Sequence, residues 1–492
     1  MNPAASERLL VGWAERDITP RLPTVLYGQF HARVATEIRD PLAATALALS
    51  EGESGDCVVL VSCDRCSIPA PVYKRCQEAL RQRVPDLAPE KLVMNATHTH
   101  TSPWILDDSY PPQVEGEMTA TEYADLFVER VAEAAEEAWR NRKPGSVGWG
   151  FGHAVVGHNR RVSYFRPYGD REGQKQAPAR AADGVSKMYG NTNDPDFSHI
   201  EGYEDHGVDL LFTWDEAGEL SGVVVNVACP SQEVESEYYV SADFWHDVRV
   251  QLRRRHGDGL RVLAQAGAAG DQSPHPLLHK AEEERMLRLR GTSRREELGR
   301  RIADAVDDVL PLAQKEPCER VVLRHAVEKV PVARWMVTDE ELATAREDLA
   351  RAEAEVPADA RAASVRHVWI NRCRRLMRRY EAQQTQPLLM EDVHAIRLGD
   401  VAFATNRFEF YLDYGLRIEA RSPARQTFVV QLVAGGEYTG TYLPTARSVA
   451  GGSYGAGAYC NEVGPEGGQQ LVEHTLRMLN ELWPEQGEAA TD

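Results

Sequence analysis

Short apolar runs alternate with longer amphipathic ones through most of the 492 residues, and this alternation is what most limits the folds open to the chain. Residues 57–62 and 91–96 are apolar runs of strand length, and residues 70–83 between them have a helical pattern. Residues 119–141 carry Ala, Val and Leu on one helical face and Glu on the other. Strands that alternate with helices are typical of an α/β core.

Composition excludes several classes of protein. Hydrophobic residues make up 42% of the chain, which is enough to bury a large core. The formal net charge of −19 argues against a nucleic-acid partner, because affinity for phosphate backbones rests on Lys and Arg. No stretch approaches the roughly 20 apolar residues of a membrane span, and no secretory leader is visible at the N-terminus. We therefore expect a cytoplasmic protein with a small-molecule substrate.

The eight cysteines are scattered along the chain, which does not fit a disulfide framework. Cys63 and Cys66 have the two-residue spacing of a zinc or redox pair, but no second pair of this kind accompanies them. Because they follow directly from an apolar run, we interpret both as core or strand-end cysteines.

Residues 1–485 are expected to form one catalytic domain. Residues 146–210 are rich in Gly, Asn, Asp, Tyr and His and show little periodicity, which predicts an unusually long, functional loop. Residues 338–383 are dense in Ala, Arg and Glu and are broken at Pro357. They predict an inserted helical hairpin on the surface with a solvated charged face, and a part in a homo-oligomer stays open. Residues 486–492 form an acidic tail.

Polar and imidazole side chains follow the apolar run that ends near Met94, in Asn95-Ala-Thr-His-Thr-His-Thr-Ser-Pro103. Strands of α/β proteins commonly deliver such side chains to the edge of a sheet, where the chemistry is placed. Along an extended backbone His98 and His100 point the same way, because side chains alternate with period two. The pair can begin a metal site or form a hydrogen-bonded polar edge.

A second run, residues 261–266, leads into the glycine-rich segment Gly267-Ala-Ala-Gly-Asp-Gln-Ser-Pro274. A strand followed by such a turn can bring a hydroxyl, here that of Ser273, to a substrate. The segment is neither the Gly-x-Ser-x-Gly elbow of an α/β hydrolase nor a phosphate loop, which needs a lysine. Ser273 and Asp271 can also be ordinary turn residues.

Together these motifs resemble those of the catalytic domain of neutral ceramidases, a family of zinc-dependent amide hydrolases. The resemblance implies a mixed-sheet α/β domain without the C-terminal β-sandwich, for which the chain is too short. The motifs that support the resemblance occur in the same order as in the family. They are Asn95–Pro103, Asn159-Arg160, Ser241-Ala-Asp243, Gly270-Asp-Gln-Ser-Pro274, Phe408-Glu409, Gly415-Leu-Arg417, Gly440-Thr-Tyr-Leu-Pro-Thr445 and Gly452-Ser-Tyr454.

By this resemblance, His98, Glu409 and Tyr442 match zinc ligands of the family. The family's second zinc histidine falls in the segment matching Asn226-Val-Ala-Cys-Pro230, which here contains no histidine. Either Cys229 takes the position as a thiolate or His246, in the predicted helix that follows, replaces it. We favour His246 because one imidazole then replaces another without adding charge to the metal.

The resemblance also places Ser273 on the family's essential serine, and Arg160 and Tyr454 beside the substrate amide. Zinc with an open position lowers the pKa of bound water to about 7 and so supplies hydroxide at neutral pH. We expect this hydroxide to attack an amide (N-acyl) carbonyl while Ser273 and Tyr454 stabilise the developing charge. His100 would shuttle a proton and Arg160 would anchor an oxygen, with Asp271 as a further catalytic candidate.

Two alternatives stay open. Trp104, Trp245 and His275 are expected near the site, and an aromatic, charged wall suits a polar or sugar-like ligand as well as an acyl chain. A zinc hydrolase acting on an ester or glycoside is therefore the second hypothesis. The third is a degenerate relative that binds a ligand without turnover, because the second zinc histidine is missing.

Overall fold

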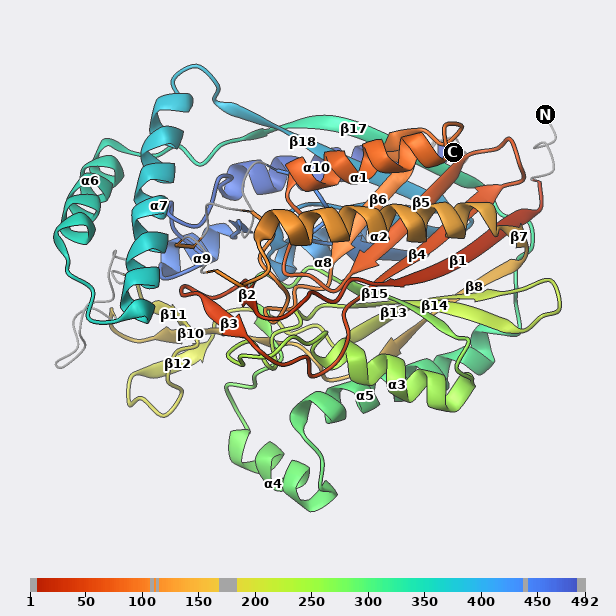
Figure 1. The fold of residues 1–492 in the computed structure, drawn as a ribbon, viewed down its shortest axis with the longest axis horizontal. Coiled ribbons are helices and arrows are strands. Elements are labelled where there is room, and N and C mark those ends of the chain that lie inside the picture. Colours follow the sequence, from red (N-terminus) through yellow and green to blue (C-terminus); the bar gives the residue numbers. More distant parts are fainter. Residues whose placement is uncertain (1–6, 107–109, 112–114, 168–183, 437–440, 485–492) are drawn as a thin grey trace, which may run out of the picture.

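Three larger sheets lie against one another and helices cover their outer faces in the computed structural model of the chain (Figure 1). The structure describes residues 7–106, 110–111, 115–167, 184–436 and 441–484. The predicted acidic tail lies outside these residues. No helix in the described part of the chain combines the length and hydropathy that crossing a bilayer demands.

The first sheet has the strand order β6-β5-β4-β1-β7. Its strands are β1 (Leu9–Asp17), β4 (Ala43–Glu51), β5 (Cys57–Cys63), β6 (Leu92–Ala96) and β7 (Lys143–Pro144). β5 and β6 run parallel, so their carboxyl ends meet at one edge of the sheet. The 3-10 turn η1 (Pro89–Lys91) leads into β6.

Helices α1 (Ala70–Arg83) and α2 (Ala120–Arg140) pack on the outer face of this sheet. α2 begins at its expected residue because Thr119 and Glu122 form a capping box, in which each side chain bonds the other's backbone N–H. Its apolar stripe of Ala, Val and Phe is buried in the core beneath, as the helical pattern of the sequence predicts.

The second sheet has the order β15-β14-β13-β8 and is covered by α3 (Phe244–His256) and α5 (Arg294–Ala313). Its strands are β8 (Ser146–His153), β13 (Gly207–Trp214), β14 (Leu220–Val227) and β15 (Arg261–Ala266). β14 and β15 run parallel, which brings the segments after residues 227 and 266 to the same edge. α4 (Lys280–Arg290) projects from this side (Figure 1).

The third sheet has the order β17-β18-β19-β21 and is covered by α8 (Leu412–Arg421) and α10 (Pro465–Glu481). Its strands are β17 (Leu323–Ala333), β18 (Leu388–Leu398), β19 (Val401–Thr405) and β21 (Gln426–Val430). The inner faces of all three sheets share one apolar core, to which Leu47, Leu211 and Phe403 each contribute from a different sheet. Layers of mixed sheets and helices confirm the predicted mixed α/β fold.

The long loop predicted over residues 146–210 is largely wrong. The region contains β8 and the short strands β9 (His158–Asn159), β10 (Arg161–Tyr164), β11 (Ser186–Met188) and β12 (Phe197–Ile200), while 168–183 lie outside the described residues. β8 lacks apolar alternation because three of its residues are glycines. A Cβ added to Gly150 would collide with the side chain of Val309 on α5, so glycine lets the helix approach the strand.

Short ribbons hold the loops at the carboxyl edges. They are β2 (Thr24–Leu26) with β3 (Arg33–Ala35), β9 with β16 (Gln272–Ser273), and β20 (Glu409–Phe410) with β22 (Tyr442–Leu443). Helices α6 (Asp339–Ala354) and α7 (Ala360–Ala382) occupy the range of the predicted hairpin. They stand at one end of the molecule beside α9 (Ala446–Gly451), as Figure 1 shows at the left.

Candidate metal centre

His98 and His100 face each other in the turn that follows β6. Their Nε2 atoms are 3.4 Å apart and their ring centroids 4.8 Å. The expected extended backbone is wrong, because His98 has a left-handed conformation with φ of 69°. Such strain at a non-glycine residue is held only where its surroundings fix it, and here the His98 N–H donates to Arg65 O at 2.8 Å.

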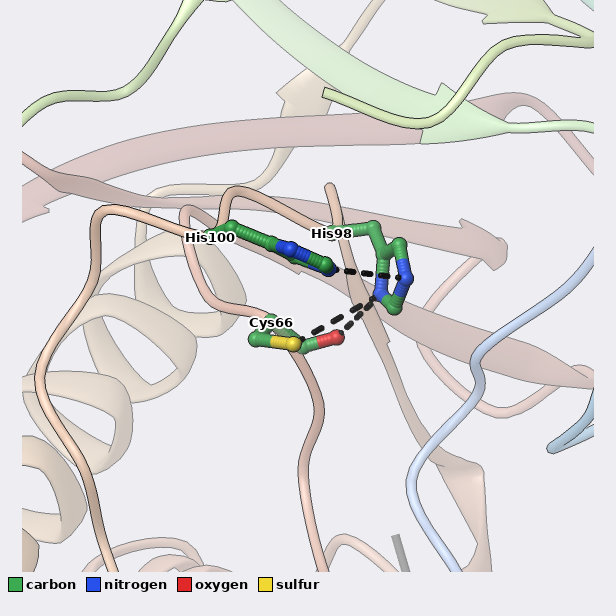
Figure 2. A group of neighbouring side chains, drawn as sticks. All are labelled: Cys66, His98 and His100. Carbon is green, nitrogen blue, oxygen red and sulfur yellow. Dashed lines mark hydrogen bonds between the residues drawn. The ribbon is translucent and has the colours of Figure 1, made fainter. Parts of the chain in front are cut away.

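Cys66 joins this pair from the segment after β5. Its thiol, His98 and His100 present ligand atoms that all lie within 4.8 Å of one another, and all three residues are buried (Figure 2). The His98 Nδ1–H donates to the backbone oxygen of Cys66 at 2.6 Å. That bond leaves Nε2 of His98 free as an acceptor or a metal ligand.

Glu409 approaches the same point from the β20–β22 ribbon. Its Oε2 lies 3.4 Å from Nε2 of His98. In the parallel ribbon Glu409 is the direct partner of Tyr442, so the carboxylate and the phenol come from adjacent residues in space. His98, Glu409 and Tyr442, which are far apart in the sequence, therefore lie in one buried cluster.

The electrostatics of the cluster favour charged donors. Burial disfavours a thiolate, but His98 and His100 outweigh it and lower the pKa of Cys66 to about 6. Burial likewise opposes a charge on His98, yet Cys66 and Glu409 raise the pKa of its imidazole. The pKa of Glu409 is lowered despite its burial, because His98 and Arg160 lie beside it. The neighbouring imidazoles and Arg160 thus favour the charged, metal-binding forms of Cys66 and Glu409.

The donor set fits a divalent metal such as zinc. Zinc takes sulfur, imidazole nitrogen and carboxylate oxygen, and donors about 2.0–2.3 Å from one ion lie about 3.3–3.7 Å apart at tetrahedral angles. The separations of 3.4 Å from His98 Nε2 to His100 and to Glu409 match that spacing and are long for hydrogen bonds. These residues can therefore hold a metal ion.

Two groups contact His100, one at each of its ring nitrogens. Gln232 Nε2 lies 2.9 Å from His100 Nε2, and Glu235 Oε2 lies 3.2 Å from His100 Nδ1. Both come from the segment after β14. A carboxylate at the second nitrogen is the usual way in which a metal-binding histidine is oriented.

Arg160 connects the donor cluster to Ser273. Its Nη2 lies 3.6 Å from Glu409 Oε2 and 3.5 Å from the Tyr442 hydroxyl, while Nη1 donates to the Tyr189 hydroxyl at 3.2 Å. Tyr189 in turn donates to Ser273 Oγ at 3.1 Å. The Nε of Arg160 is buried and has no hydrogen-bond partner in the described structure.

Tyr454 lies at the rim of this cluster, with its ring 5.6 Å from that of Tyr442. Phe30 packs on Tyr454 at 5.3 Å, and Trp369 of α7 stacks on Phe30 at 6.2 Å. Arg372 of α7 lies over the Tyr454 ring at 5.6 Å. One face of α7 therefore contacts the aromatic rim of the site and is not simply solvated.

The aromatic wall expected from Trp104 and Trp245 is wrong, because both indoles are buried in hydrophobic cores. His275 does lie nearby, with its Nε2 2.7 Å from the backbone oxygen of Gln232. Tyr189 is 38% exposed, so the site meets solvent on the side of Tyr189 and Tyr454.

Asp271 has a structural position. Its side chain accepts hydrogen bonds from Asn159 Nδ2 at 2.8 Å and from the Leu412 N–H at 2.9 Å, and its backbone oxygen accepts from the Arg160 N–H at 2.9 Å. It therefore fixes the backbone that carries Arg160 and the start of α8. These contacts do not support the catalytic role expected for Asp271.

Neither candidate for the second family ligand belongs to the donor cluster formed by the described residues. Cys229 is buried among Trp245 and other core residues, and burial with the Asp243 carboxylate nearby raises the pKa of its thiol well above the usual value. His246 lies in the first turn of α3, half-buried beside Asp247.

Sequence reasoning missed Cys66 as a donor, and it missed Gln232, Glu235 and Tyr189. The spacing of Cys63 and Cys66 was a signal, but the two cysteines separate in the fold. Cys63 is the last residue of β5 and lies in the core, whereas Cys66 lies three residues beyond it at the sheet edge. The parallel pairing of β5 with β6 then sets Cys66 beside the histidine turn.

Fold and site together define a mixed α/β protein with a buried cysteine–histidine cluster that can bind a metal. The structure resembles that of neutral ceramidase from Pseudomonas aeruginosa with a TM-score of 0.65 and 17% identity, over 96% of this chain and 75% of that chain. A ceramidase complexed with C2 matches with a TM-score of 0.66 and 16% identity, over 97% and 76%. No family model and no curated protein sequence matches the chain. The predicted resemblance is confirmed for the fold.

Proposed function

We propose that the protein is a zinc-dependent hydrolase that cleaves an amide (N-acyl) bond. One observation carries the proposal: metal-binding groups from the ends of β5, β6 and β20 meet at one buried point, and Arg160 joins that point to Ser273 through Tyr189. The likeness in fold to ceramidases, which suggested an amide as the substrate bond, supports the same chemistry.

In this proposal Cys66, His98 and His100 hold the ion, and Glu409 and Tyr442 face it from the β20–β22 ribbon. Cys66 thus replaces the histidine that the family has after its equivalent of β14. Glu409 either completes the donor set or takes a proton from a water. Glu409→Gln separates these roles, because loss of a ligand lowers the metal content, whereas loss of a base lowers kcat at full metal content.

When bound, zinc polarises a carbonyl and lowers the pKa of water. The protein's own residues would bind and orient the substrate. The unpartnered Nε of Arg160 is available to a substrate carbonyl oxygen. Ser273, held by Tyr189, and Tyr454 at the rim are positioned donors for charge that develops on the oxygen or the leaving group.

A cysteine-dependent hydrolase is the second candidate. Cys66 Sγ lies 3.8 Å from His98 Nδ1, and its pKa is lowered to about 6, as in an activated thiol. Its burial at 3% exposure disfavours this reading, because a nucleophile has to reach the substrate. Ester or glycoside hydrolysis, and binding without turnover, stay open as alternatives.

The test begins with metal analysis of the purified protein and a screen of N-acyl amines, esters and glycosides. We expect about one zinc per chain, turnover of an N-acyl compound, and loss of turnover on chelation that zinc restores. Turnover that survives chelation but is abolished by iodoacetamide would favour the cysteine mechanism. Bound zinc without turnover of any amide would refute the proposed function.

A further inference from the structure

A cavity of about 310 Å³ lies where the inserted hairpin meets the third sheet, away from the donor cluster. Arg378 and Arg379 of α7 line one side, and Arg334, just after β17, lines another. Leu389 and Met390 of β18 provide an apolar wall. Its volume is at the lower end of that of small-molecule pockets, about 300–1,000 Å³.

The acidic residues that line the cavity already have cationic partners. Arg407 bonds both oxygens of Glu391, at 2.5 and 2.8 Å, and also bonds Glu462 at 2.8 Å. Asp392 pairs with Lys329 at 2.9 Å. These carboxylates are therefore engaged by cations other than Arg334, Arg378 and Arg379.

The other three arginines lack such partners. In the described part of the chain, no carboxylate lies within ion-pair distance of Arg334, Arg378 or Arg379. Arg379 is 6% exposed, and its Nη1 donates to Ala458 O at 2.5 Å, whereas its Nη2 has no hydrogen-bond partner. The Nε of Arg334 is also buried without one. Burial lowers the pKa of Arg379 to about 10, and the Glu462 carboxylate nearby only partly offsets this effect.

A buried guanidinium without a counter-ion is costly, and this chain carries a net charge of −19, with carboxylates in excess to pair its arginines. Unpaired arginines around a cavity therefore suggest that the counter-charge comes from a ligand. Guanidinium groups favour carboxylate and phosphate, whose oxygens match their fork of donors. The apolar wall suits a small carbon skeleton.

We propose that this cavity binds a small organic anion, a carboxylate or a phosphate monoester, held between Arg334 and Arg379 with the exposed Arg378 at the mouth. The bound anion joins α7 of the hairpin to the segment after β17, and so fastens the insertion to the catalytic core. The inference does not depend on the proposed hydrolase activity.

Isothermal titration of the full chain with sodium phosphate and with sodium succinate, at constant ionic strength in chloride, tests the proposal. We expect saturable binding of at least one of them, weakened about tenfold or more in Arg379→Met and in Arg334→Met. Arg374→Met is the matched control on the same helix, because Arg374 is outside the cavity and pairs with Glu353 at 2.8 Å. Its affinity should equal that of the wild type.

The two probes distinguish the chemical class of the ligand. Binding of phosphate alone supports a phosphate ester as the ligand, and binding of succinate alone supports an organic acid. If the anion binds at the metal centre instead, both arginine variants will keep the wild-type affinity, and that result overturns the proposal. The absence of saturable binding for both probes overturns it as well. Circular dichroism checks the folding of each variant. If Arg379→Met does not fold, the affinity of the Arg334→Met variant, at the half-buried Arg334, tests the proposal by itself.

Discussion

Two strand ends face each other at the candidate site, and they contribute different chemistry. The segment after β6 carries His98 and His100, and the parallel strand β5 adds Cys66 to the same edge. The segment after β14 carries Gln232 and Glu235, which contact His100 at Nε2 and at Nδ1. A backbone bond from Ser231 N–H to Thr97 O, at 3.2 Å, joins the two segments.

One strand end thus carries the candidate metal donors, and the other contacts His100. In our proposal the end of β6 binds the metal together with Cys66, whereas the end of β14 orients His100. Gln232 and Glu235 follow directly after the segment in which the resemblance predicts a histidine. The following variants test this division of roles.

Removal of His98 should have the largest effect. Because even groups that only orient metal ligands contribute about 10–100-fold to affinity, we expect His98→Ala to weaken zinc binding by more than about 100-fold and to abolish turnover. His246→Ala, in α3, is the matched control, and this variant should keep its zinc. Competition with a chromophoric chelator measures both. Zinc lost from the His246 variant and retained in the His98 variant would reverse the division.

Two buried cysteines give the next test. Cys66→Ser should weaken zinc binding about 10–100-fold, because a hydroxyl is a poorer donor than a thiolate. Cys229→Ser should leave zinc binding unchanged, since Cys229 packs in the core of the second sheet. Equilibrium dialysis with zinc compares the two. An equal loss in both variants would mean that each strand end supplies a ligand.

A smaller effect is expected at the supporting strand end. Glu235→Gln removes the carboxylate beside His100 Nδ1 and should lower zinc affinity about tenfold without abolishing binding. Glu237→Gln, an exposed neighbour, serves as the control. If the Glu235 variant loses zinc as completely as His98→Ala does, Glu235 is itself a ligand.

The last prediction concerns the pH dependence of stability and Glu233, which also lies in the segment after β14. Burial, with the Asp243 carboxylate nearby, raises the pKa of Glu233 from 4.5 to about 8. The folded protein thus keeps a proton that the unfolded chain has released, so stability falls as pH rises from about 4.5 to about 8 and levels above. Glu233→Gln should remove this loss, up to about 1.4 kcal/mol per pH unit.

Urea denaturation of this variant and of Glu237→Gln between pH 5 and pH 9 measures the effect. A wild type and a Glu233 variant with parallel pH profiles would show that Glu233 ionises normally. The strand end would then be more open to water than its burial suggests.

Periodicity predicted the regular parts of the fold well. α2 and the strand before His98 lie within about one residue of their predicted bounds, because apolar spacing and the Thr119 cap are local signals. β8 was missed because its glycines serve a contact with α5, which is not visible in the strand's own pattern. The same limit applies to the hairpin's inner face, where Trp369 and Arg372 contact Phe30.

The site was predicted in part for a similar reason. Resemblance pointed to His98, Glu409 and Tyr442, and the structure places these side chains together. Cys66 could not be chosen over Cys229 from spacing, because the choice depends on which strands pair in parallel. The left-handed turn at His98, which brings the imidazoles together, also depends on that packing.

X-ray absorption at the zinc edge of the purified protein tests the central claim most directly. We predict one sulfur scatterer at about 2.3 Å with nitrogen and oxygen at about 2.0–2.2 Å. The sulfur shell should be absent in Cys66→Ser and unchanged in Cys229→Ser. A shell of nitrogen and oxygen alone in the wild type, or a sulfur shell that disappears with Cys229, would contradict the account.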